Sequence, residues 1–74
     1  MTVEVELFGQ LLPGRQRKQS LELEYPLKVG EVATRLGLKS QEIGLITINN
    51  VQSELEDPVP PNSRLCFFPH MSGG

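Results

Sequence analysis

Apolar and polar residues alternate at the start of the chain, in the segment TVEVELF (residues 2–8). Three apolar side chains share one side of an extended backbone: Val3, Val5 and Leu7. Two glutamates and Phe8 share the other side. This period of two is typical of a strand with one buried face. The segment QSLELEY (residues 19–25) alternates in the same way, with Leu21, Leu23 and Tyr25 on one side. A glycine- and proline-containing loop joins the two segments, so the pattern predicts a β-hairpin.

The segment VGEVATRLGL (residues 29–38) changes to the helical period. Its apolar positions are Val29, Val32, Ala33 and Leu36. Gly37 stands where helices commonly end in a left-handed residue. No good capping side chain precedes the helix, so we expect packing on the sheet to hold it in place. The following KSQEIG is expected to form at most one helical turn.

Two further strands are predicted in the second half of the chain. LITIN (residues 45–49) is a short apolar run, typical of a strand inside a sheet. Asn49-Asn50 predicts a turn, and the prolines of residues 58–61 forbid a long strand. RLCFF (residues 64–68) is the last strand, and it is halted by Pro69. The order hairpin, helix, strand, short piece and strand predicts an α+β chain of the β-grasp (ubiquitin-like) type, a mixed sheet with one main helix packed across one face.

Alternation also predicts which side chains form the core and which face outward. The expected core residues are Val3, Val5, Leu7, Leu21, Leu23, Val32, Leu36, Ile46, Ile48, Leu65 and Phe67. In a β-grasp sheet the first and last strands usually pair, which places Phe8 and Phe68 on the same uncovered face. Two neighbouring exposed aromatic residues indicate a protein interface. The alternative is that loops cover both rings.

Composition narrows the possible functions. The chain has 74 residues and a net charge of −2, which fits one domain over residues 1–74 and argues against nucleic acid as a partner. The basic cluster Arg15, Arg17 and Lys18 is interpreted as a solvated turn. Neither a signal peptide nor a membrane-spanning run is recognised, so we expect a cytoplasmic protein that does not bind membranes.

Residues that often carry out catalysis are few. Cys66 is the single cysteine and lies between apolar neighbours in a strand, so we expect an unreactive structural thiol. His70 has no acid or nucleophile near it in the sequence and is interpreted as a tail residue. No metal site is expected, because no Cys/His cluster has the necessary spacing.

The sequence finishes with HMSGG, and we expect residues 70–74 to form a flexible diglycine tail. Glycine has no Cβ, so Gly73 and Gly74 could pass through a narrow enzyme passage that excludes other residues. Pro69 would stiffen the base of this tether. A terminal carboxylate becomes a good electrophile once it is converted to an acyl-adenylate or a thioester. The alternative is an ordinary frayed end.

The whole chain resembles the MoaD/ThiS family of ubiquitin-like sulfur carriers. The resemblance rests on VEVELFGQL at the start, on VGEVATRLGL, on ITINN and on PVPPNSRLCFFPHMSGG. Phe-Phe-Pro followed by Gly-Gly is its most specific element, and it is more similar to the small subunit of molybdopterin synthase (MoaD) than to the thiamine-pathway carrier. His70, Met71 and PPNS depart from the family pattern. His70 replaces a proline and implies a looser tether, and PPNS replaces an acidic turn, which leaves the identity of the partner open.

The resemblance implies a sulfur carrier that is not an enzyme by itself. A ubiquitin-activating-type adenylyltransferase (MoeB/ThiF-like) would use ATP to adenylate the Gly74 carboxylate, so the chain itself binds no cofactor. A sulfur donor such as a cysteine desulfurase or a rhodanese would then form a thiocarboxylate. A MoaE-like large subunit would accept the tail and transfer its sulfur to precursor Z (cyclic pyranopterin monophosphate). Phe8 and Phe68 would dock on the partners, with Pro69, Met71 and Ser72 at the base and lining of the inserted tail.

Three other functions remain open at this point. The chain could carry sulfur for thiamine thiazole or another product. It could be a ubiquitin-like modifier that forms isopeptide bonds with lysines. It could also be a β-grasp interaction module whose diglycine has no role.

Overall fold

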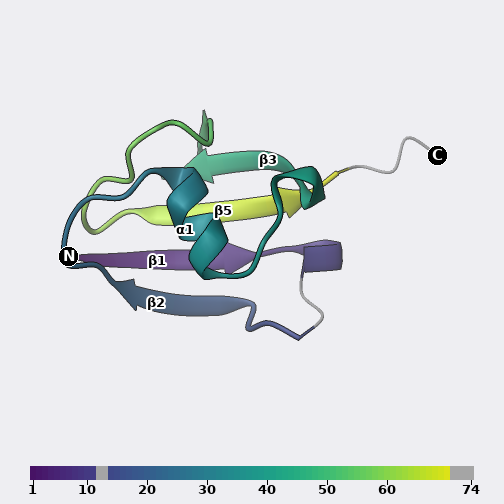
Figure 1. Ribbon diagram of the computed structural model, residues 1–74, viewed down its shortest axis with the longest axis horizontal. Coiled ribbons are helices and arrows are strands. Elements are labelled where there is room, and N and C mark those ends of the chain that lie inside the picture. Colours follow the sequence, from purple (N-terminus) through teal and green to yellow (C-terminus); the bar gives the residue numbers. More distant parts are fainter. Residues whose placement is uncertain (12–13, 71–74) are drawn as a thin grey trace.

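The computed structural model describes residues 1–11 and 14–70 and has the α+β architecture of a β-grasp fold. Its elements, in chain order, are β1 (Thr2–Leu7), η1 (Gly9–Leu11), β2 (Lys18–Glu22), α1 (Val29–Arg35), η2 (Ser40–Glu42), β3 (Ile43–Ile48), β4 (Val51–Ser53) and β5 (Arg64–Pro69). In Figure 1, α1 crosses one face of the sheet. The single turn expected after the helix is η2.

The five strands form one mixed sheet in the order β2-β1-β5-β3-β4. β1 and β5 are parallel, and the other neighbouring pairs are antiparallel. The predicted pairing of the first and last strands is therefore confirmed. β3 lies between β5 and β4, as expected of an interior strand. β5 ends at the opposite end of the sheet from the start of β1 (Figure 1).

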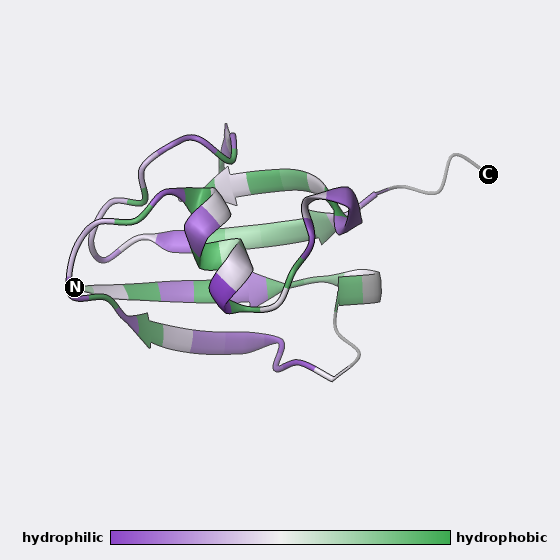
Figure 2. Ribbon diagram, in the orientation of Figure 1, coloured by the Kyte–Doolittle hydropathy of each residue, from purple (hydrophilic) through white to green (hydrophobic). Residues whose placement is uncertain are grey.

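The core lies between α1 and the sheet. Eight of the eleven expected core residues are buried, and Leu21, Leu36 and Ile48 are partly buried against them. The hydrophobic core also contains seven residues outside that expected set: Leu11, Leu27, Val29, Ala33, Leu38, Ile43 and Val59. β3 and β5 are mostly hydrophobic along their length, whereas the edge strand β2 is mostly hydrophilic (Figure 2). The sheet thus has an apolar centre and a polar edge.

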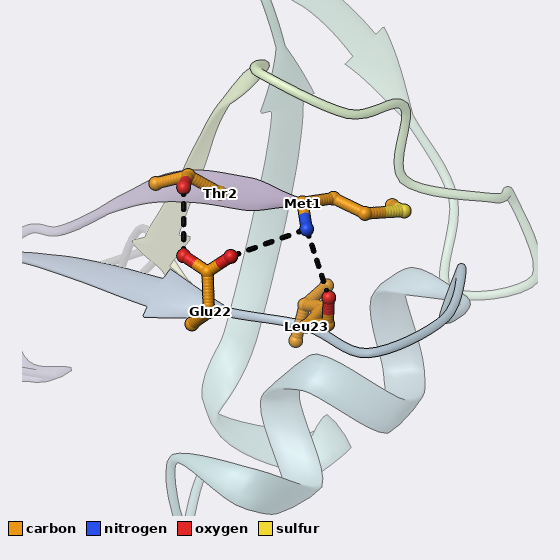
Figure 3. A network of polar contacts seen from close by, with 4 residues as sticks. All are labelled: Met1, Thr2, Glu22 and Leu23. Carbon is orange, nitrogen blue, oxygen red and sulfur yellow. Dashed lines mark hydrogen bonds and ion pairs between the residues drawn. The ribbon is translucent and has the colours of Figure 1, made fainter.

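The second strand ends earlier than predicted. β2 stops at Glu22, and Tyr25, which was expected to share a face with Leu21 and Leu23, is 57% exposed. The start of β1 closes the hairpin instead (Figure 3). The α-amino group of Met1 donates hydrogen bonds to Leu23 O at 3.0 Å and to Glu22 Oε1 at 3.2 Å. The Thr2 hydroxyl donates a hydrogen bond to Glu22 Oε2 at 2.8 Å. This hydrogen bond and, to a smaller extent, the one from the Met1 ammonium lower the pKa of Glu22.

Helix α1 ends as predicted, but its two caps were not foreseen. Gly37 has a left-handed φ of +77°. At the start of the helix, Lys28 N donates to Glu31 Oε1 at 2.9 Å, so a carboxylate from inside the helix stabilises its first turn. At the end, the Arg15 guanidinium donates to the carbonyls of Leu36 and Gly37 at 3.3 and 2.8 Å. The interpretation of Arg15 as part of a solvated turn is therefore wrong, because it joins the hairpin loop to the helix.

Candidate functional site

The face of the sheet opposite α1 carries the two phenylalanines that the sequence placed together. Phe8 follows β1 directly, and Phe68 lies near the end of β5. Their rings stack with centroids 4.5 Å apart and an interplanar angle of 8°. Both side chains are half-buried, so each keeps part of its surface open to a partner. The alternation of β1 and β5 therefore predicted this contact correctly.

A third apolar side chain extends this surface. Leu45 is the cross-strand partner of Phe68, which puts both side chains on the same face of the sheet. Leu45 is 40% exposed, although the sequence analysis assigned it to a buried strand. We call Phe8, Leu45 and Phe68 the open-face patch. The patch was partly hidden in the sequence because LITI is apolar on both faces, so that its period of two cannot be seen.

Next to the patch, the same face becomes polar. Arg64 Nη2 donates to Glu6 Oε1, and the two residues belong to neighbouring strands. Glu6 was grouped with the outward-facing residues, yet it is only 7% exposed. The hydrogen bond from Arg64 lowers the pKa of Glu6, and its effect outweighs the opposing effect of desolvation. A hollow of about 330 Å³ is lined here by Glu4, Val5, Glu6, Lys18 and Arg64.

Cys66 lies on the same face of β5 as Arg64 and Phe68, between these two residues. Its cross-strand neighbours are Glu6 on β1 and Thr47 on β3. Its side chain is nevertheless buried, with 4% exposed surface. A thiol shielded in this way fits the structural role expected from the sequence.

The base of the expected tail lies beside the open-face patch. Pro69 is the last residue of β5 and is half-buried, and His70 is exposed. A hollow of about 310 Å³ is lined by Gly44, Leu45, Phe68, Pro69 and His70. The predictions for Met71, Ser72, Gly73 and Gly74 lie outside the described residues. The stacked rings of Phe8 and Phe68 therefore lie beside the end of β5, after which the sequence continues to Gly-Gly.

Two further searches concern the part of the chain that the structure describes. Within residues 1–11 and 14–70, no group of three or more His, Cys, Asp or Glu residues could hold a metal ion. None of the helices in these residues is long and apolar enough to cross a membrane.

Comparisons with known proteins place the fold. No family model matches the chain, and no curated protein matches it by sequence. Among solved structures, it is similar to SAMP1 from Haloferax volcanii, with a TM-score of 0.74 and 21% identity over 100% of both chains. It is also similar to a chain in the complex of subunits 1 and 2 of molybdopterin-converting factor from Helicobacter pylori 26695. There the TM-score is 0.66 and the identity 20%, again over 100% of both chains. The part of the chain that the structure describes therefore has the β-grasp fold of ubiquitin-like proteins.

Proposed function

We propose that this protein is a sulfur carrier of the MoaD/ThiS type, whose Gly74 carboxylate is activated and converted to a thiocarboxylate. The observation that carries this proposal is the position of the stacked Phe8–Phe68 pair beside the end of β5. A carrier needs a docking surface close to its reactive end, because docking must bring that end to a buried site on another protein. The full-length β-grasp fold and the Gly-Gly sequence support the same function.

The chemistry requires three displacement steps, which occur in turn at phosphorus, at the Gly74 carbonyl carbon and at sulfur. A carboxylate oxygen of Gly74 attacks the α-phosphorus of ATP, and pyrophosphate leaves. The terminal sulfur of a donor persulfide then attacks the carbonyl carbon and displaces AMP, which gives an acyl disulfide. A second thiol reduces this disulfide and releases the thiocarboxylate. ATP is consumed by the activating enzyme, so the carrier needs no bound cofactor.

The carrier's own residues would dock, thread and present the acyl group. The open-face patch supplies the docking surface, because aromatic residues, Phe among them, are enriched at protein interfaces. Gly73 and Gly74 let the backbone enter a narrow passage, with Met71 and Ser72 along its walls. Pro69 fixes φ where this segment begins. The catalytic side chains belong to the partners.

The partners follow from this role. We propose a MoeB/ThiF-like adenylyltransferase, a cysteine desulfurase or rhodanese as sulfur donor, and a MoaE-like large subunit of molybdopterin synthase, all in the cytoplasm. The Helicobacter pylori structure supports the last partner, since it is a complex of subunits 1 and 2 of molybdopterin-converting factor. Phe-Phe-Pro at residues 67–69 also favours molybdopterin synthesis over the thiamine thiazole pathway.

A second candidate function is that of a protein modifier. SAMP1, a ubiquitin-like modifier, is similar in fold to this chain. A modifier shares the activation step and differs in the acceptor, which is a lysine amine in place of a sulfur donor. The two functions are distinguished by their products, a thiocarboxylate or a covalent protein conjugate.

The activation step is the first test of the proposal. With an adenylyltransferase of the MoeB/ThiF type, the chain should promote exchange of labelled pyrophosphate into ATP, and deletion of Gly74 should abolish that exchange. A chain with Lys39 replaced by Ala, an exposed position in the turn before η2, is the matched control and should exchange as the wild type does. Exchange that persists without Gly74 would contradict the assignment of the reactive carboxylate.

A further inference from the structure

Gly44 allows the end of β5 to lie unusually close to β3. The pairing of β3 with β5 shifts between Ile43, which faces Pro69, and Leu45, which faces Phe68. Gly44 is therefore the extra residue of a β-bulge. A Cβ on Gly44 would stand 2.7 Å from Pro69 O, 2.7 Å from His70 Cα and 2.9 Å from His70 N. These neighbours are backbone atoms, so any side chain at residue 44 would push the departing chain away.

Gly9 approaches the same point from the other neighbouring strand. It follows β1, which pairs with β5 on the side opposite β3. Gly9 has a left-handed φ of +57°, and a Cβ on it would stand 2.9 Å from Pro69 Cγ. Phe8 N donates to Phe67 O at 3.2 Å, which holds this segment against β5. Pro69 thus lies between Gly44 of β3 and Gly9, the first residue of η1.

We propose that Gly9 and Gly44 are positioning residues that fix the direction in which the chain leaves β5 at Pro69–His70. This inference rests on the proposed function, because the direction matters only if the segment beyond His70 must enter a partner while the open-face patch is docked. The patch and the exit point are then one rigid unit: Phe68 pairs with Leu45, and Gly44 is the residue beside Leu45. Docking through the patch then sets the direction in which the chain leaves Pro69–His70 toward the activating site.

The consequence is kinetic and concerns the step after docking. A displacement of about 1 Å at the reacting group can reduce the rate about 100-fold, even when its cause lies far from the chemistry. A side chain at residue 44 or 9 leaves the patch residues unchanged and moves the exit. We therefore expect such a variant to bind its activating enzyme normally and to be adenylated slowly.

Gly44→Ala is the direct test, in the full-length chain with the adenylyltransferase. The pyrophosphate-exchange kcat should fall about 10- to 100-fold, whereas the KM for the carrier should stay within about twofold of the wild-type value. The backbone N–H dipolar coupling of His70, measured by NMR on the free protein, should change as well. An unchanged kcat in a folded Gly44→Ala chain would overturn the proposal, and so would a raised KM with the kcat unchanged.

Gly9 offers a second test that does not depend on Gly44→Ala folding. Gly9→Ala should lower the kcat, and the loss should be smaller in a Pro69→Ala background, because the Pro69 ring is the obstacle. The matched control is Gly37→Ala, which has the same left-handed strain at φ +77° but meets no described atom within 4 Å. Gly37→Ala should keep the wild-type kcat. Equal losses from Gly9→Ala in both backgrounds would contradict the proposed contact.

Failure of the proposed function gives a different result. If the wild-type chain supports no exchange, the sulfur-carrier proposal fails. The dipolar coupling of His70 still reports whether the two glycines orient the end of β5. A coupling that is the same in Gly44→Ala, Gly9→Ala and the wild type would overturn the positioning role by itself.

Discussion

Phe68 is the central residue of the proposed docking surface. It stacks on Phe8, pairs with Leu45 across the sheet and precedes Pro69 at the end of β5. We predict that Phe68→Ala raises the Kd for the large synthase subunit about 30-fold, a loss of about 2 kcal/mol. The fold should persist, because the ring is only half-buried. Calorimetric titration measures the affinity, and far-UV circular dichroism checks the fold.

Val51→Ala is the matched control for this titration. Val51 is the most exposed large hydrophobic residue of the described chain, at 68%, and it pairs with Ile48 away from the patch. Its removal should leave the affinity unchanged. An unchanged affinity for Phe68→Ala would show that the patch does not dock.

For single residues, the alternation of apolar and polar positions predicted which side chains share a face of the sheet. Phe8 and Phe68 were assigned to one face because β1 and β5 alternate cleanly. The role of Gly44 could not be predicted, since a bulge depends on the register between two strands that are far apart in the sequence. The burial of Glu6 could not be predicted either, because it depends on Arg64 reaching across from β5.

At the element scale, Arg15 links two elements that the sequence analysis treated separately. It donates to Leu11 O at 3.1 Å in η1 and to two carbonyls at the end of α1. The last carbonyls of a helix have no partner within the helix, and a cation there also interacts favourably with the helix dipole. Arg15→Ala should therefore lower the free energy of unfolding by about 1 kcal/mol, as measured by urea denaturation.

Arg17 provides the comparison for Arg15. It is exposed, it belongs to the same basic cluster, and its carbonyl serves the sheet by accepting a hydrogen bond from Leu7 N. Arg17→Ala keeps that carbonyl and should be nearly as stable as the wild type. Equal losses for both variants would mean that net charge, and not the cap, explains the effect.

The ends of elements were predicted correctly where a residue that favours a left-handed backbone marks them. Gly37 marked the end of α1, and Asn49 and Asn50 made the expected turn with φ values of +51° and +69°. The end of β2 was misplaced because Glu22–Tyr25 still alternates after the strand has lost its partner. The register of β1 and β2 ends with Thr2 opposite Glu22, so Glu24 and Tyr25 alternate outside the paired residues.

At the scale of the whole molecule, stability should depend on acidity through three carboxylates. Hydrogen bonds lower the folded-state pKa values of Glu6, Glu22 and Asp57 below their ordinary values of 4.5, 4.5 and 3.8. A lowered folded pKa contributes stability that is present above the ordinary pKa and is lost as the pH falls through the lowered value. Urea denaturation should therefore show constant stability from neutral pH to about 5 and a decline below about 4.5.

Arg64→Met tests how much Glu6 contributes to the change of the free energy of unfolding with pH. The variant removes the group that lowers the pKa of Glu6, so it should be less stable than the wild type at pH 7. The difference should shrink as the pH falls from about 4.5 toward the lowered folded-state pKa of Glu6 in the wild type, below which Glu6 is protonated in both chains. Lys28→Met, which breaks the exposed pair of Lys28 with Glu56, should match the wild type throughout. A constant deficit of Arg64→Met at every pH would point to lost packing instead.

The β-grasp topology itself was predictable from the sequence. The order of elements allows few sheets, and the apolar runs of β3 and β5 fit interior positions. The chemistry was less predictable, because one fold hosts many functions and because, in the proposed function, the reacting atoms belong to two proteins. In the proposed function, the open-face patch beside the end of β5 docks on the partner that carries out the chemistry.

The intact mass of the chain, after incubation with ATP, a MoeB/ThiF-type adenylyltransferase and a persulfide donor, would show directly whether it carries sulfur. A sulfur carrier should gain a mass equal to the replacement of one oxygen by sulfur, and this gain should be absent when Gly74 is deleted. A ladder of covalent conjugates without that gain would show a modifier instead of a sulfur carrier. An unchanged mass would contradict both functions.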